Sequence, residues 1–165
     1  MSESAREFFD TSVLIAACSP EQPGHEESRR LLAAATRGTS ACGAHTLAEI
    51  YAVMSRLPGG RRQRPELAER LVSQIADKVS VVPLTAEEYR DTIGSAARSG
   101  VAGGTIYDGL LLTCARKVDA DRIYTWNVRH FQMVAPDLAG RIAEPGQQDS
   151  LGVDHESDED LIGFP

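Results

Sequence analysis

Residues 6–18, REFFDTSVLIAAC, contain the pattern that decides the fold. Phe8 and Phe9 are predicted to end a short first β-strand. The following TSVLIAAC predicts a helix, with Asp10 or Thr11 at its N-cap. Asp10 therefore comes directly after the carboxyl end of a strand, in a segment that otherwise has the composition of a core. Burying an uncompensated carboxylate costs on the order of several kcal/mol, so a partner for Asp10 is expected.

Two further carboxylates interrupt apolar segments in the same way. Glu49 lies in AHTLAEIYAVM and Asp108 lies in GGTIYDGLLLTCA. The nearest Lys or Arg is four residues from Asp10, seven from Glu49 and eight from Asp108, so local ion pairing does not neutralise them. Hard divalent cations such as Mg²⁺ prefer oxygen ligands, often a few carboxylates completed by water and substrate phosphates. A shared divalent metal is therefore the predicted partner.

The rest of the chain alternates between helical and strand patterns. Helices are predicted over 24–37, from Thr46 to the Pro58-Gly59-Gly60 break, over 65–78, over 85–99 and from Thr105 onward, with a short helical turn at 128–131. Strands are predicted at 40–42, 79–84 and 122–126, with a weak one at 133–134. Because no hairpin signal appears, the pattern indicates a single α/β domain with a central parallel sheet and helices on both faces. Ligands of such folds bind at the carboxyl ends of the strands.

The charge is unevenly distributed along the 165 residues. From Glu144 onward there are seven acids and no Lys or Arg, and these seven acids account for the whole net charge of −7. Residues 1–143 therefore hold 17 acids and 17 bases and form the predicted globular domain. Residues 144–165 are predicted to be an acidic, disordered tail. The excess of acidic residues therefore lies in that tail, and the negative net charge of the chain does not argue against a polyanionic substrate.

Compartment signals are few. No stretch approaches the roughly 20 apolar residues of a membrane span, and the N-terminus lacks the pattern of a secretory signal. Three cysteines, Cys18, Cys42 and Cys114, lie in apolar segments away from zinc-ligand spacings. These features predict a cytoplasmic protein with reduced, buried thiols.

Each polar residue also has a purely structural interpretation. Asp10 and Asn127 could be N-caps, and the pairs Thr46 with Glu49 and Thr105 with Asp108 both match a capping box. Two other metal-binding classes fit less well. A receiver-type domain needs an adjacent acidic pair after one strand, and a haloacid-dehalogenase-like phosphatase needs a second acid where this chain has Ser12.

Four segments resemble the PIN-domain ribonucleases, and within them the VapC-type toxins of toxin–antitoxin pairs. The segments are FFDTSVLI, AHTLAEIYAVMSRLPGG, YDGLLLTCARK and IYTWNVRHF, in the family's order and over residues 7 to about 135. The resemblance implies a PIN-like nuclease domain over 1–143. It also implies an Mg²⁺- or Mn²⁺-dependent endoribonuclease, a homodimer and a cognate antitoxin that blocks the site.

By position, the resemblance carries the family's acidic site onto Asp10, Glu49 and Asp108 as metal ligands. Asn127 falls where many PIN domains have a fourth acid, and it is expected to orient a catalytic water. In the expected reaction the metal activates water and stabilises charge on the leaving oxygen of an RNA phosphodiester. The alternative is a catalytically degenerate PIN-like module that binds RNA or protein, and the replacement of an acid by Asn127 favours it.

Substrate contacts are predicted outside the acidic centre. Arg61, Arg62 and Arg64 form the densest basic cluster of the chain, beside Gly59-Gly60, and are candidates for binding RNA phosphates. Thr11 is a further candidate for a phosphate contact. His45 and His130 are interpreted as structural, because a metal-activated water needs no histidine base.

Overall fold

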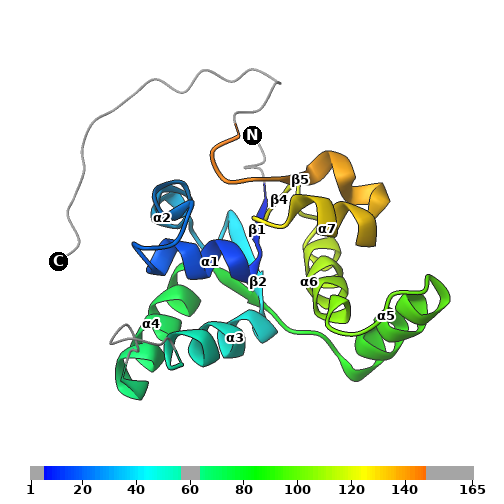
Figure 1. The fold of residues 1–165 in the computed structure, drawn as a ribbon, viewed down its shortest axis with the longest axis horizontal. Coiled ribbons are helices and arrows are strands. Elements are labelled where there is room, and N and C mark those ends of the chain that lie inside the picture. The colour runs from blue at the N-terminus through cyan, green and yellow to red at the C-terminus, as the bar shows by residue number, and fades with distance from the viewer. Residues whose placement is uncertain (1–5, 57–63, 148–165) are drawn as a thin grey trace.

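The computed structural model describes residues 6–56 and 64–147, whose helices and strands alternate along the chain (Figure 1). The elements are β1 (Glu7–Phe9), α1 (Thr11–Cys18), α2 (His25–Ala34), β2 (Ser40–Gly43), α3 (Ala44–Met54), α4 (Pro65–Lys78), β3 (Ser80–Val82), α5 (Ala86–Arg98), α6 (Thr105–Lys117), β4 (Arg122–Tyr124), α7 (Val128–Val134), a 3-10 helix (Pro136–Arg141) and β5 (Ile142–Ala143). This order agrees with the predicted α/β class.

The five strands form one parallel sheet in the order β3-β2-β1-β4-β5. Helices α1 to α4 lie on one side of the sheet, and α6 and α7 lie on the other (Figure 1). β1 is the central strand, with β2 and β3 on one side of it and β4 and β5 on the other. The carboxyl ends of β1 and its neighbours β2 and β4 therefore meet at one edge, as predicted for a ligand site.

The central strand shows why helices cover both faces. Successive side chains of a strand point to opposite faces, and both Phe8 and Phe9 are fully buried. Phe8 packs in a cluster with Leu111 and Phe131, whereas Phe9 packs in a second cluster with Ile50. The consecutive phenylalanines thus anchor one half of the core each.

A glycine at the end of β2 brings α6 close to the sheet. A Cβ added to Gly43 would lie 2.8 Å from Leu111 Cδ2, closer than real side-chain contacts allow. The absence of a side chain lets α6 pack directly over the end of β2. This close packing holds the first turn of α6 near the carboxyl edge of the sheet.

Some predicted boundaries were wrong. The predicted strand at 133–134 lies within α7, and the fifth strand is Ile142–Ala143. Helix α3 begins at Ala44, two residues before Thr46, so Thr46 and Glu49 do not form a capping box. Gly104 occupies the N-cap position of α6, so Thr105 does not form one with Asp108 either. Helix α5 does begin with a capping box, formed by Thr85 and Glu88.

The described residues end shortly after the predicted domain boundary. β5 ends at Ala143, and a turn follows to residue 147. The remainder of the predicted tail, 148–165, lies outside the described residues. None of the helices in the described part of the chain is both long and apolar enough to cross a membrane.

The three cysteines are free thiols, and we expect them to react slowly. Cys42 and Cys114 are buried, and Cys18 is partly exposed. Burial raises the pKa of Cys42 to about 12 and that of Cys18 and Cys114 to about 11, so little reactive thiolate forms at neutral pH. Ellman's reagent should titrate three thiols rapidly in denatured protein and react slowly with the native protein, at Cys18 first. Immediate titration of all three in the native protein would contradict this packing.

Candidate active site

Asp10 is held at the carboxyl ends of the two central strands. It follows β1, its backbone N–H donates to the carbonyl of Tyr124 at the end of β4 (3.0 Å), and its side chain is 4% exposed. The hydroxyls of Ser12 and Thr125 both donate to its Oδ2, at 2.6 and 2.8 Å. Asp10 occupies the N-cap position of α1 without a side-chain capping bond. Asp10 is thus the N-cap residue, as predicted, but its carboxylate binds the hydroxyls of Ser12 and Thr125 instead of making a capping bond.

Burial raises the pKa of Asp10, against the opposing effect of its hydrogen-bond donors. The donors that favour the charged form are the hydroxyls of Ser12 and Thr125 and the backbone N–H groups of Thr11 and Ser12. These donors are neutral, so the charge itself is not cancelled. The folded chain thus holds a carboxylate in a desolvated position that a bound cation would stabilise.

The same hydroxyls tie Asp10 to the segment after β4. Ser12 Oγ accepts the backbone N–H of Trp126 (3.1 Å), and Thr125 Oγ1 accepts that of Asn127 (3.0 Å). Each hydroxyl therefore donates to Asp10 and accepts from the backbone. This network fixes the Asp10 side chain relative to both strands.

Glu49 lies in α3, which begins where β2 ends. Its Oε1 is 3.1 Å from Nε2 of His45, one turn earlier on the same helix. His45 in turn stacks on Tyr107 of α6, with ring centroids 5.2 Å apart and the ring planes 6° from parallel. The Glu49 side chain is 30% exposed and is therefore open to a ligand.

Asp108 lies in the first turn of α6, opposite the first turn of α7. Its Oδ2 is 2.7 Å from Nδ1 of His130, whose Nε2 lies 3.4 Å from the hydroxyl of Thr105. Burial raises the pKa of Asp108, and the negative charges of Asp10 and Glu49 raise it further, while His130 opposes both effects. The three acids, from three different elements, therefore act on one electrostatic site.

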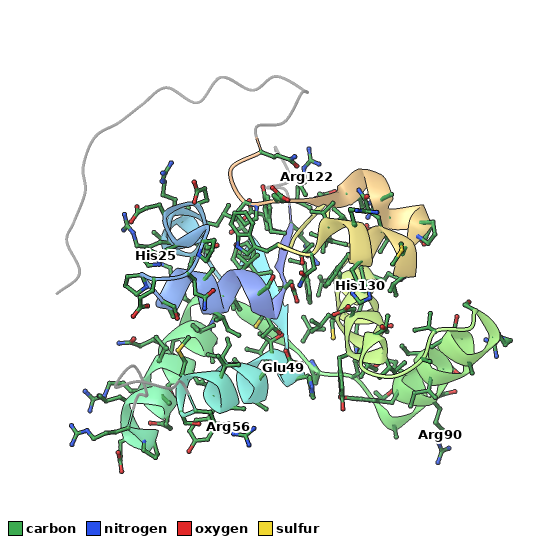
Figure 2. The ribbon with its side chains drawn as sticks, viewed as in Figure 1. His25, Glu49, Arg56, Arg90, Arg122 and His130 are labelled. Atoms are coloured by element: carbon green, nitrogen blue, oxygen red, sulfur yellow. The ribbon has the colours of Figure 1, made fainter. Side chains whose placement is uncertain are left out.

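Figure 2 shows Glu49 and His130 in the middle of the molecule, where α1 and α3 face α6 and α7. Across the described residues, no three His, Cys, Asp or Glu side chains are arranged to hold a metal ion by themselves. In the described part of the chain the acids therefore do not form a closed metal cage. Such a donor set fits a hard cation that keeps several waters and binds substrate phosphate.

The other predicted site residues have different surroundings. Asn127 is exposed at the N-terminus of α7, next to Thr125. The buried Thr11 donates its hydroxyl to Thr46 (3.0 Å) and so joins α1 to α3, which gives it a structural role. Arg64 is exposed at the start of α4. Arg61 and Arg62 lie outside the described residues.

Sequence reasoning missed the two histidines as partners of the acids. His45 was detectable, because residues four apart share one face of a helix and Glu49 is four residues later. His130 is 22 residues after Asp108 in the sequence, and only the packing of α7 on α6 brings the two together. The lack of Lys and Arg nearby in the sequence therefore does not mean that these acids lack side-chain partners.

We expect the hydroxyl of Thr125 to be needed for an intact site. Thr125→Val removes the donor to Asp10 and the acceptor of Asn127 N–H with little change in volume. A loss of an outer-shell partner typically costs about 10- to 100-fold in metal affinity or activity. The Mn²⁺ affinity of Thr125→Val, measured by calorimetry, should therefore be about 10- to 100-fold lower than that of the wild type. Thr113→Val, which removes a hydroxyl between α5 and α6, is the matched control, and equal affinity in both variants would contradict the role of Thr125.

Comparison with known families agrees with this geometry. Residues 8–135 match the PIN domain family. This match runs from Phe8 in β1 to the end of α7 and includes all three acids. No curated protein sequence matches the chain.

Solved structures share the fold at low identity. VapC20 of Mycobacterium tuberculosis, a Sarcin-Ricin loop cleaving toxin, has a TM-score of 0.56 and 19% identity, covering 73% of this chain and 89% of that one. FitAcB of Neisseria gonorrhoeae has a TM-score of 0.60 and 20% identity, covering 86% and 99%. A toxin-antitoxin complex from Klebsiella pneumoniae has a TM-score of 0.59 and 15% identity, covering 84% and 97%.

Proposed function

Because this chain belongs to the PIN domain family, we propose that it is an Mg²⁺- or Mn²⁺-dependent endoribonuclease that hydrolyses RNA phosphodiester bonds. Its metal ligands in this proposal are Asp10, Glu49 and Asp108. A bound divalent ion supplies an activated water and stabilises negative charge on the phosphate. The chain supplies the ligands and their placement at the carboxyl edge of the sheet.

One observation carries the proposal: neighbouring side chains contact each of the three carboxylates through a single oxygen. Ser12 and Thr125 bind Oδ2 of Asp10, His45 contacts Oε1 of Glu49, and His130 contacts Oδ2 of Asp108. Within the described residues, no side-chain donor reaches the second oxygen of any of these acids. Each acid is therefore oriented by the protein and has one oxygen that no side-chain donor of the described residues contacts.

The remaining site residues complete the proposal. Asn127 is exposed beside Thr125, where its side-chain amide can orient the attacking water. Arg64, with Arg61 and Arg62 from the same sequence cluster, is proposed to contact RNA phosphates away from the metal. Binding through these arginines should weaken as salt concentration rises. The buried Thr11 is proposed to support this site through Thr46 rather than to contact phosphate.

We further propose that the protein is the toxin of a VapBC-type pair, cytoplasmic and homodimeric, with a cognate antitoxin that blocks the site. The support is the fold of its structural relatives, which include a VapC toxin and a toxin-antitoxin complex. Co-expression with the product of the neighbouring reading frame tests this proposal. Rescue of growth together with a stable complex would support it, and growth inhibition that the neighbour leaves unchanged would contradict it.

Cleavage of total cellular RNA by the purified protein tests the nuclease activity. We expect discrete fragments with Mg²⁺ or Mn²⁺ and none with EDTA, and mapping the fragment ends would identify the target. The second candidate is a degenerate RNA- or protein-binding module, favoured by Asn127 in place of an acid. Tight RNA binding without metal-dependent turnover would favour that module.

A further inference from the structure

The first turn of α6 presents an exposed aromatic ring beside the acidic site. Tyr107 is 48% exposed and immediately precedes Asp108. One face of its ring is covered by His45, in a nearly parallel stack with 5.2 Å between centroids. His45 is itself fixed by Glu49. The ring is therefore held in a defined orientation by a residue that contacts Glu49, on the turn of α6 that carries Asp108.

The turn that precedes α6 is open to solvent. The turn before α6 ends in Gly103 and Gly104, both exposed, and a Cβ added to either would meet nothing within 4 Å. His45 covers one face of the ring, and about half of Tyr107 remains exposed to solvent. Tyr107 thus offers a flat aromatic surface to a ligand.

We propose that the stacked pair of His45 and Tyr107 is a platform for a nucleobase of single-stranded RNA. Single-stranded nucleic acids bind aromatic side chains by stacking their bases on them, and the interaction tolerates different sequences. A base stacked on Tyr107 places its nucleotide next to Asp108, and so beside the phosphate to be cleaved. The inference rests on the proposed function, because it assigns a substrate contact to the same site.

Binding of two homopolymers tests the platform without requiring cleavage. Fluorescence anisotropy would measure the affinity of labelled ten-nucleotide oligo(A) and oligo(U) RNA for the full chain carrying Asp10→Asn, in Mg²⁺. Because purines stack more strongly, the parent should bind oligo(A) more tightly. Adding Tyr107→Ala should weaken oligo(A) binding roughly ten-fold or more. It should also reduce the difference in affinity between oligo(A) and oligo(U). Tyr107→Phe, which keeps the ring, should bind like the parent.

Two controls separate stacking from other effects. Tyr107→Leu keeps apolar volume but not the aromatic face and should behave like Tyr107→Ala. Tyr51→Ala removes another tyrosine of similar exposure (41%), two residues from Glu49 and so on a different side of α3. It should leave both affinities unchanged.

Several results would overturn the inference. Tyr107→Ala could bind oligo(A) as tightly as the parent, or the parent could bind neither RNA. Tyr107→Phe could also lose as much affinity as Tyr107→Ala, which would indicate a contact of the hydroxyl instead of the ring. A change only in the solution mass of Tyr107→Ala would assign the ring to a protein interface and also contradict the platform. Failure of the proposed nuclease is a separate result, because it is scored by cleavage with the wild-type protein while the platform is scored by binding.

Discussion

Asp10→Asn is expected to abolish RNA cleavage while leaving the fold intact. Asp10 is the most buried of the three acids, and the substitution removes its charge but keeps its shape. Loss of an outer-shell partner typically costs about 10- to 100-fold, so removal of a ligand should exceed about 100-fold. The measurement is the single-turnover cleavage rate of the RNA identified by fragment mapping, at saturating Mg²⁺ or Mn²⁺.

The stability of the same variant separates a functional carboxylate from a structural one. Burial raises the pKa of Asp10, so in metal-free protein at neutral pH the charged form opposes folding. Asp10→Asn should therefore unfold at the same temperature as the wild type or at a higher one. Asp77→Asn, which alters an exposed acid of α4, is the control and should retain full activity. Retained cleavage in Asp10→Asn, or a large drop in its unfolding temperature, would contradict this assignment.

Phe8→Ala is expected to cause the largest loss of stability. Phe8 is fully buried in the central strand and packs against α6 and α7. Removing a buried phenylalanine side chain costs about 3–5 kcal/mol, a large part of the roughly 5–15 kcal/mol that stabilises a typical domain. Urea unfolding should report this loss. Trp126, the single tryptophan of the chain, provides a fluorescence signal.

Two further variants test whether the core is divided as described. Phe9→Ala should cost a similar amount, because Phe9 anchors the cluster on the opposite face of the sheet. Met133→Ala changes a side chain that is 72% exposed and should leave the free energy of unfolding within about 0.5 kcal/mol of the wild-type value. If Phe8→Ala lowers the free energy of unfolding by less than about 1 kcal/mol, packing on the two faces of the sheet does not depend on β1.

The sequence predicted most of the fold because its signals are local. The apolar run before Asp10, the capping box at Thr85 and the proline that opens α4 each mark an element boundary within a few residues. β5 escaped prediction because its two residues, Ile142 and Ala143, are too few for a periodic pattern. Met133 and Val134 were assigned to a strand on composition, but α7 continues through them.

The site was predictable in part. The three acids stand out because each interrupts an apolar segment, and the parallel sheet implies a shared edge. The contacts that orient them are mostly non-local: Thr125 reaches Asp10 across 115 residues and His130 reaches Asp108 across 22. Such partners follow from tertiary packing. The predicted roles of Asn127 and of the arginines at 61, 62 and 64 remain predictions.

Mn²⁺ binding to the acidic site tests the central claim most directly. Electron paramagnetic resonance measures free Mn²⁺, and hence the affinity, in the wild type, in Asp10→Asn, Glu49→Gln and Asp108→Asn, and in the control Asp77→Asn. A single site built from three elements predicts that each of the first three variants weakens binding substantially and that Asp77→Asn binds like the wild type. Wild-type affinity in all of the variants, or no binding by the wild type, would show that Asp10, Glu49 and Asp108 do not form a metal site.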